Sequence, residues 1–334
     1  MSHKPEHFLW LDDSPEIIPD SLLRDIRNSG GGTDLTITGV RDKNLSEVLS
    51  ELVQQPSPTL VILDHVLNKT AGRLFQKGST VAAELRDHWP TVPIVGVTAA
   101  INTYADRLSH LAIPEYLTVF QREGFAGQID ALHGFATGHR QIASSGFPIV
   151  ERVHDLLGTP EEDKGTLLLA LPSDLKKSTV PEGAVHQFAR WLLHRFLSRP
   201  GFVYDRLHAA TYLGLNEAAF DRTATVFEPA RYRGVFASQN SPRWWVSGLK
   251  GCLLAAVREP RLALPAKRGR LLPGIRPEDY SRCHYSEKDL PDVVAAPDET
   301  SEELHPARSE LTILSRTDTP TVGFEPRRVL ARRT

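Results

Sequence analysis

The sequence predicts a doubly wound α/β domain at the N-terminus, followed by a mainly α-helical domain and an irregular C-terminal tail. Over the first 140 residues, short β-rich runs alternate with amphipathic helical stretches, the pattern of a parallel sheet covered by helices. The run Thr59–Asp64 (TLVILD) is apolar up to its last residue, as expected of a central strand buried on both faces. Five such β/α repeats fit a single domain spanning residues 1–140.

The elements of this domain follow from local pattern. Five strands are expected, at His7–Asp13, Asp34–Val40, Thr59–Asp64, Pro93–Thr98 and Tyr116–Phe120. The helix expected at Leu45–Gln55 carries leucine and valine at helical spacing, and a polar stretch follows the third strand at Asn68–Lys77. The remaining helices are expected at Pro15–Asn28, Ser79–His88, Tyr104–Leu111 and Phe125–Phe135.

The second half of the chain has mostly helical periodicity. Gly138–Phe147 is interpreted as a linker or as the frayed end of the preceding helix. Residues 141–184 are interpreted as a connector, 185–275 as a basic helical domain, and 276–334 as a tail or small irregular module. Helices are expected at Val185–Leu197, Tyr204–Leu213 and Glu217–Ala224, and another is opened by Ser241-Pro242 with Trp245, Leu249, Leu253 and Val257 on one face. In the tail, Leu311–Leu314 and Arg328–Leu330 are either short strands or part of a largely disordered segment.

Composition places the chain among ordinary globular proteins, with 40% apolar and 24% charged residues. No apolar run approaches the roughly 20 residues of a membrane span, no secretory signal is visible, and two cysteines suit a reducing cytosol. We therefore expect a cytoplasmic protein without membrane contact.

The two halves of the chain differ in charge. Residues 1–140 hold 12 Lys/Arg and 17 Asp/Glu, a net charge of −5, whereas residues 186–270 hold 14 Lys/Arg and 5 Asp/Glu, a net charge of +9.

Acidic and hydroxyl side chains follow three predicted strands at the point where each ends. Asp12-Asp13 end the first strand, Asp64 the third, and Thr98 the fourth. Because ligands bind at the carboxyl ends of parallel strands, these side chains are expected to lie together. Taken singly, each has a plainer interpretation, such as Asp13 as a helix N-cap. Together, the carboxylates are typical of a Mg²⁺ site. In such a site, one carboxylate can attack a phosphoryl group while the metal neutralises charge on the transferring oxygens.

This arrangement resembles the receiver domains of response regulators, over about 140 residues. The matching residues are Leu11-Asp12-Asp13, Leu63-Asp64 and Val97-Thr98-Ala99. The resemblance implies a flavodoxin-like five-stranded fold, with Asp12, Asp13, Asp64 and the backbone carbonyl of Val66 holding Mg²⁺. It further implies that Asp64 accepts the phosphoryl group from a histidine kinase or other phosphodonor and that Thr98 senses it.

The sequence departs from the family in two places. The family's lysine after the fifth strand is absent from Tyr116–Gly124 (YLTVFQREG), where Arg122 is the nearest cation and is expected to contact the phosphate instead. The loop after Asp64 is also longer, through Asn68-Lys69-Thr70-Ala71-Gly72. Two functions therefore stay open: a phosphorylated regulator, or a pseudo-receiver adaptor that docks partner proteins without being phosphorylated.

The second half suggests an output or docking domain. Leu207–Arg222 has the spacing of a helix-turn-helix, so DNA binding is one alternative, although its second helix is poor in residues that read bases. Contacts with nucleic acid or a partner protein are expected at Arg222, Arg231, Arg233, Arg243 and Trp244, whereas Trp245 lies on the apolar stripe. No catalytic motif is visible, and we expect a signalling protein that is not an enzyme.

Overall fold

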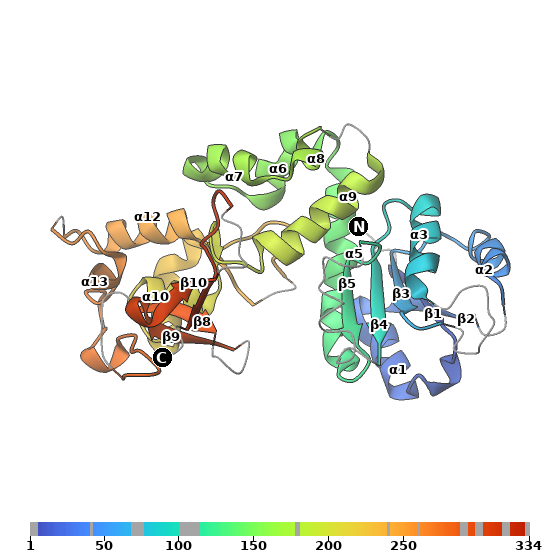
Figure 1. Cartoon of the computed structure of the whole chain (residues 1–334), viewed down its shortest axis with the longest axis horizontal. Helices are drawn as coiled ribbons and strands as arrows, with labels where there is room; N and C mark the ends of the chain where they lie inside the picture. The colour runs from blue at the N-terminus through green and yellow to red at the C-terminus, as the bar shows by residue number, and fades with distance from the viewer. Residues whose placement is uncertain are drawn as a thin grey trace. The chain divides into compact units, whose positions relative to one another are not determined.

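The computed structural model describes residues 6–40, 43–67, 77–99, 114–177, 181–238, 241–259, 261–287, 293–297, 303–315 and 321–330. The chain forms two compact units, which are described separately (Figure 1). The first comprises Met1–Arg152 and Asp174–Leu192; the second comprises Val153–Ser173 and Leu193–Thr334. The predicted helix Tyr104–Leu111 and the loop Asn68–Gly72 lie outside the described residues. No helix in the described ranges is long and apolar enough to cross a membrane.

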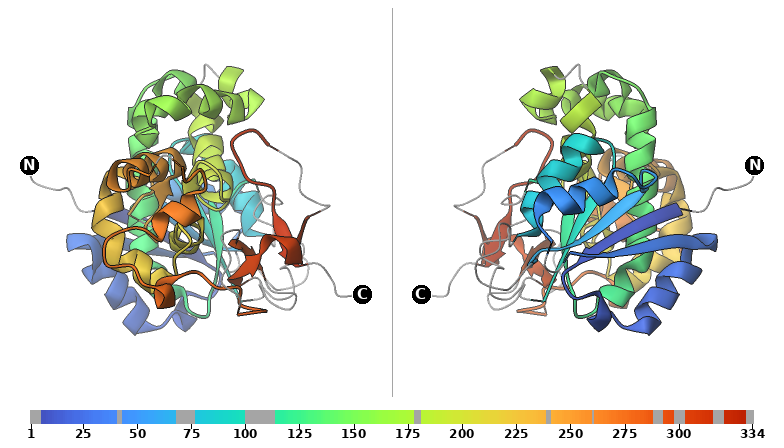
Figure 2. Two further views of the ribbon diagram at one scale, coloured as in Figure 1. Left: turned by 90° about the vertical axis from the view of Figure 1, so that its left-hand side faces the viewer. Right: turned by 90° about the vertical axis from the view of Figure 1, so that its right-hand side faces the viewer.

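The first unit is built on a five-stranded parallel sheet. Its strands are β1 (Glu6–Asp12), β2 (Thr33–Gly39), β3 (Leu60–Asp64), β4 (Ile94–Thr98) and β5 (Thr118–Gln121). They pair in the order β2-β1-β3-β4-β5, the flavodoxin-like order, and β1 and β2 lie side by side in the right-hand view of Figure 2. The predicted fold class of this part of the chain is confirmed.

The register aligns the carboxyl ends of the strands at one edge of the sheet. Asp12 is level with Gly39 of β2, Asp64 with Val97, and Thr98 with Gln121. Each predicted site residue on β1, β3 and β4 is the last residue of its strand. Their side chains therefore leave the sheet at the same edge.

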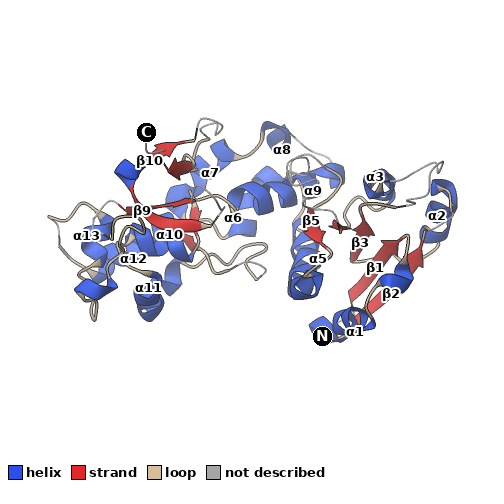
Figure 3. Cartoon of the chain, turned by 60° about the horizontal axis from the view of Figure 1, so that its bottom comes forward, coloured by secondary structure: helices blue, strands red, loops and turns tan. Residues whose placement is uncertain are grey.

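Helices cover both faces of the sheet, α2 (Leu45–Leu52) and α3 (Gly78–His88) on one and α1 (Asp20–Asn28) and α5 (Ile129–Ser144) on the other (Figure 3). One apolar cluster packs alternate residues of β1 and β3 against α2 and α3. On the opposite face Trp10 contacts Phe125 edge-on, with ring centroids 5.5 Å apart. This double cover explains why β3 is buried along its whole length.

Two helices of this unit differ from the sequence-based expectation. The first begins at Asp20 rather than Pro15, because Pro19 takes an extended conformation and only a short turn, Pro15–Ile17, precedes it. The last begins with a 3₁₀ turn at Phe125–Gln128 and continues as α5 to Ser144. Of the two interpretations of Gly138–Phe147, the linker is therefore wrong up to Ser144, where the chain is still the end of this helix. Burial of His139 and Ile142 keeps this part of the helix on the sheet.

A helix from beyond residue 140 completes the first unit. This helix, α9 (Pro181–Trp191), follows the short α8 (Ser173–Lys177) and packs against α5. Its His186 Nε2 lies 2.7 Å from the carbonyl oxygen of Pro114, and Arg190 donates a 2.9 Å hydrogen bond to that of Tyr116. The boundary expected at residue 185 therefore falls inside a helix that belongs to the sheet-containing unit.

The second unit is mainly helical. Its helices are α7 (Lys164–Ala170), a π turn (Leu192–Phe196), α10 (Arg206–Tyr212), α11 (Glu217–Thr223), α12 (Val246–Ala256) and α13 (Pro265–Gly269), and α6 (Ile149–Leu157) leads into it. Short 3₁₀ turns lie at Ser29–Gly31 in the first unit and at Glu161–Asp163, Ala224–Ala230, Pro277–Asp279 and Ser309–Leu311 in the second. Helix α12 begins at Val246 instead of after Ser241-Pro242, because Trp244–Trp245 pair as strand β7 with β6 (Val203–Tyr204).

The C-terminal region contains two antiparallel strand pairs. Strands β10 (Thr312–Leu314) and β11 (Arg328–Leu330) pair with each other, which confirms the two short strands expected there. Strands β8 (Val293–Pro297) and β9 (Leu304–Arg308) form a second pair that the sequence pattern does not reveal.

Candidate functional site

Three carboxylates meet at the carboxyl edge of the sheet. One oxygen each of Asp12, Asp13 and Asp64 lies within 4.8 Å of the others. Asp12 and Asp64 end β1 and β3, and Asp13 follows directly. All three are buried, at 0%, 4% and 3% exposure respectively. The structure thus brings together the acids that the sequence pointed to.

The first two acids have different surroundings. Asp12 Oδ1 accepts a 2.9 Å hydrogen bond from the backbone N–H of Ser14. Asp13 does not take the capping role considered for it, because Ser14 is the residue that precedes the 3₁₀ turn Pro15–Ile17. Its Oδ1 is buried without a hydrogen-bond partner among the described residues. A buried carboxylate oxygen with no donor is costly, and a cation would satisfy it.

The surroundings of Asp64 disfavour its ionised form. Burial, opposed by the Arg122 guanidinium and reinforced by the charge of Asp12, raises the pKa of Asp64 from 3.8 to about 6. Its Oδ1 accepts a 3.3 Å hydrogen bond from the N–H of Val66. At neutral pH the ionised form prevails, although it is destabilised by its surroundings.

Arg122 lies inside the carboxylate cluster. Its backbone N–H donates a 2.8 Å bond to the carbonyl of Thr98, which fixes the residue just past β5. One guanidinium nitrogen, Nη2, lies 2.6 Å from Asp12 Oδ2 and 3.1 Å from Asp64 Oδ2. Thr98, which ends β4, is completely buried. The cation that the sequence offered in place of the family's lysine is therefore in contact with two of the three acids.

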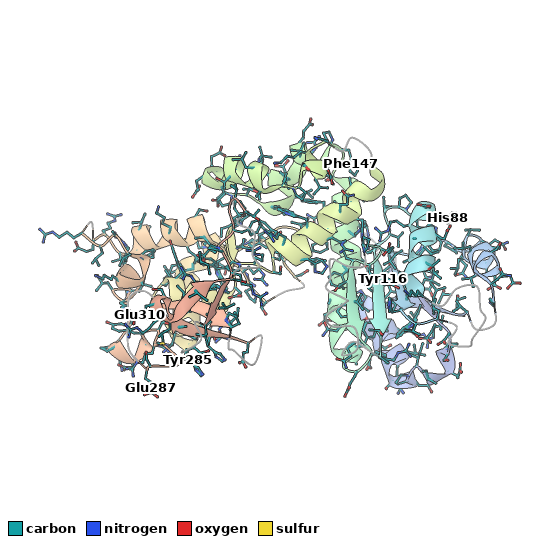
Figure 4. All side chains as sticks on the ribbon, viewed as in Figure 1. His88, Tyr116, Phe147, Tyr285, Glu287 and Glu310 are labelled. Atoms are coloured by element: carbon teal, nitrogen blue, oxygen red, sulfur yellow. The ribbon has the colours of Figure 1, made fainter. Side chains whose placement is uncertain are left out.

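Two residues that the sequence did not point to, Gly78 and Tyr116, lie next to Asp64. A side chain at Gly78, the first residue of α3, would meet the Asp64 carbonyl oxygen at 2.2 Å and Tyr116 Oη at 2.6 Å. Tyr116 also packs edge-on against His65, with ring centroids 5.9 Å apart, and Figure 4 labels it in this unit. No sequence signal marks these residues, since their contacts arise only when α3 and the segment before β5 are brought to β3.

The oxygen set fits a hard divalent cation such as Mg²⁺. Three carboxylates within 4.8 Å offer oxygen ligands, which Mg²⁺ prefers, and Asp13 Oδ1 has no other partner in the part of the chain that the structure describes. Asp12, Asp13 and Asp64 are the residues that would hold the ion. Val66 lies two residues beyond Asp64, with its N–H directed to that carboxylate.

The residues of the second unit that were expected to contact nucleic acid or a partner do not form a cluster like that of the three acids. Arg222 pairs with Asp279 at 2.5 Å, and Arg231 and Arg233 pair with Glu228 at 3.6 and 2.9 Å. Burial lowers the pKa of Arg243, which is mostly enclosed.

The two tryptophans of this unit are core residues. Trp244 is 6% exposed and packs edge-on against Phe220, with ring centroids 4.8 Å apart, which leaves little of its ring for a partner. Trp245 is 3% exposed, as expected of a core residue, although it lies in β7 and not on the helix face where the sequence placed it.

The helix-turn-helix-like segment forms two short helices joined by a tight turn. Asn216 caps α11 by accepting from the N–H of Ala219, and Gly214 takes a φ of +69° in the turn. The exposed acids of α11 are paired with a cation of α10: Arg206 contacts Glu217 at 3.2 Å and Asp221 at 2.8 Å. The outer face of α11 therefore presents an ion-pair network to solvent.

No protein-family model and no curated protein matches the chain. Solved receiver domains do match its N-terminal part. The signal receiver domain of an HD domain-containing protein from Pseudomonas fluorescens Pf-5 covers 41% of this chain and 98% of its own, with 14% identity and a TM-score of 0.29. A receiver domain protein from Clostridium thermocellum covers 41% and 97%, with 15% identity and a TM-score of 0.32. The response regulator TrrA from Thermotoga maritima, in complex with Mg²⁺ and BeF, covers 35% and 86%, with 24% identity and a TM-score of 0.26.

Proposed function

We propose that this chain is a response-regulator-like signalling protein whose first unit accepts a phosphoryl group on Asp64 with the help of Mg²⁺. The observation that carries the proposal is the meeting of Asp12, Asp13 and Asp64 at the ends of adjacent strands, with one buried oxygen lacking a partner among the described residues. A histidine kinase or another phosphodonor would supply the phosphoryl group.

The chemistry is a displacement at phosphorus. A carboxylate oxygen of Asp64 forms the new P–O bond while the bond from phosphorus to the donor breaks, and the donor leaves with the bonding electron pair. Bound Mg²⁺ would offset negative charge on the transferring oxygens. Asp12 and Asp13 would hold that ion, and Thr98 at the end of β4 is the hydroxyl expected to donate to the phosphoryl group.

A second function, that of a non-phosphorylated adaptor, is favoured by one observation. Arg122, a residue of the chain itself, already pairs with Asp12 and Asp64. A site satisfied in this way can keep its fold without metal or phosphate and serve as a docking platform. The same experiment separates the two functions.

The decisive measurement is intact-mass spectrometry after incubation with Mg²⁺ and acetyl phosphate. The wild type should gain the mass of one phosphoryl group, lost again on treatment with hydroxylamine, which cleaves acyl phosphates. Asp64→Asn should gain none, whereas Asp130→Asn, which alters an acid in the first turn of α5, should behave as the wild type. An unmodified wild type would support the adaptor instead.

For the second unit we propose protein docking in preference to DNA binding. Arg222, Arg231 and Arg233 are engaged with acids and Trp244 is buried, so the surface expected to grip phosphates is largely neutralised. DNA binding predicts an electrophoretic shift that weakens steeply with salt and is lost in Arg231→Gln/Arg233→Gln. Docking predicts no such shift.

A further inference from the structure

The four carboxylate oxygens of Asp12 and Asp64 are all engaged by donors of this chain. Asp12 Oδ1 accepts from Ser14 N–H and Asp64 Oδ1 from Val66 N–H. The second oxygen of each, Oδ2, is taken by Arg122, at 2.6 and 3.1 Å. Asp13 Oδ1 is buried and has no hydrogen-bond partner within the described ranges.

A single nitrogen of Arg122 bridges the two carboxylates, as a metal ion would. Mg²⁺ binds oxygens at about 2.0–2.1 Å and tolerates little distortion. The Arg122 nitrogen lies 2.6 and 3.1 Å from one oxygen of each of two carboxylates that would serve as ligands of the ion. A guanidinium is permanently charged, and at this distance it also repels an incoming cation. Arginine and metal would therefore compete for the same carboxylates.

The position of Arg122 allows its side chain to turn away from the carboxylates of Asp12 and Asp64. It lies at the rim of the sheet just after β5, and its side chain is 24% exposed while those of Asp12 and Asp64 are 0% and 5% exposed. Its backbone stays anchored by the bond to Thr98, so that only the side chain has to turn outward. Water would hydrate the freed guanidinium, and a bound cation would replace its charge beside the two buried carboxylates.

We propose that Arg122 is an internal counter-cation that closes the acidic site and is displaced by Mg²⁺, so that this residue sets the metal affinity. Metal-free protein holds Arg122 on Asp12 and Asp64; metal-bound protein holds the ion there and frees the guanidinium. The freed guanidinium is then available for the oxygens of a phosphoryl group. This last role rests on the proposed function, whereas the exchange of cations does not.

The test compares Mg²⁺ binding by the full chain without any phosphodonor. Arg122→Gln keeps much of the side-chain length but removes the charge, and its apparent Kd for Mg²⁺, measured by calorimetry, should be at least about tenfold lower than that of the wild type. Arg140→Gln removes an exposed cation of the same unit, paired with Glu6, and should leave the Kd unchanged. Equal or weaker Mg²⁺ binding by Arg122→Gln, or no binding by either protein, would overturn the proposal.

A second measurement needs no variant that might unfold. In the wild type, the Nε–Hε NMR signal of the Arg122 guanidinium should move to a solvent-exposed position as Mg²⁺ saturates the site. A signal that stays in place while Mg²⁺ binds contradicts displacement. If Mg²⁺ displaces Arg122 yet Asp64 is never phosphorylated, the cation exchange stands and the phosphoacceptor function fails. Phosphorylation without displacement refutes the cation exchange and supports the phosphoacceptor function.

Discussion

At Asp64, burial and charge act in opposite directions. Burial favours the neutral acid and the Arg122 guanidinium favours the carboxylate, and the outcome is a pKa raised to about 6. The protein environment favours the protonated form of such an acid and destabilises the ionised form. A destabilised carboxylate gains more free energy from binding a cation or accepting a phosphoryl group.

This imbalance predicts that Asp64→Asn stabilises the first unit at neutral pH. Because the folded-state pKa lies above the ordinary 3.8, the contribution of Asp64 is fully present below about pH 4 and is lost as pH rises through about 6. The wild type should lose up to about 3 kcal/mol relative to the variant across that window. Hydrogen exchange of β1 and β3 amides, compared at equal pH, measures the difference for this unit alone.

The control for this prediction is Asp34→Asn, which changes an exposed acid on β2. Because its side chain is exposed, this variant should change the stability of the first unit far less than Asp64→Asn does. A stability difference for Asp64→Asn that does not change with pH would show that Asp64 titrates normally.

At the scale of elements, the start of α3 is fitted to the end of β3. The N–H of Gly78 donates a 2.9 Å bond to the carbonyl of His65, which brings the helix against the strand end that carries Asp64. Tyr116, before β5, fills the remaining space and stays buried with its hydroxyl unpaired within the described residues. Position 78 therefore leaves no room for a side chain.

Gly78→Ala should therefore destabilise the first unit by about 1–3 kcal/mol, since the new Cβ would meet Asp64 and Tyr116 at 2.2 and 2.6 Å. Thermal denaturation measures the loss. Gly127→Ala is the matched control: a Cβ there meets nothing within 4 Å, so this variant should be neutral or slightly stabilised. Equal melting temperatures for the two variants would mean that α3 shifts freely away from β3.

At the scale of the whole molecule, the units are not consecutive along the chain. Residues 153–173 belong to the second unit although both flanking segments belong to the first. Helix α9 returns to the sheet-containing unit and buries Val185 and Phe188 completely. The first unit is thus larger than residues 1–140, the range that the sequence pattern predicts for it.

A fragment of residues 1–145 should accordingly be less stable than one of residues 1–192, by a few kcal/mol, because it lacks the two apolar side chains that α9 buries. Urea unfolding of both fragments measures the difference. Phe188→Ala in the longer fragment should reproduce part of the loss. If the shorter fragment is as stable as the longer one, α9 contributes nothing to the sheet-containing unit.

The sequence by itself determined the α/β class of the first unit, the positions of its five strands to within a residue or two, and the acids at their ends. These are local properties: alternation of apolar runs marks strands, and the last residue of a parallel strand must lie at the binding edge whatever covers the sheet.

Only the tertiary structure decided the partners of those acids. That Arg122 would bridge Asp12 and Asp64, that Gly78 and Tyr116 would close in behind Asp64, and that α9 would join the first unit depend on which segments meet across the fold. Such contacts join residues from 14 positions apart (Asp64 and Gly78) to 110 positions apart (Asp12 and Arg122), and no local pattern encodes them.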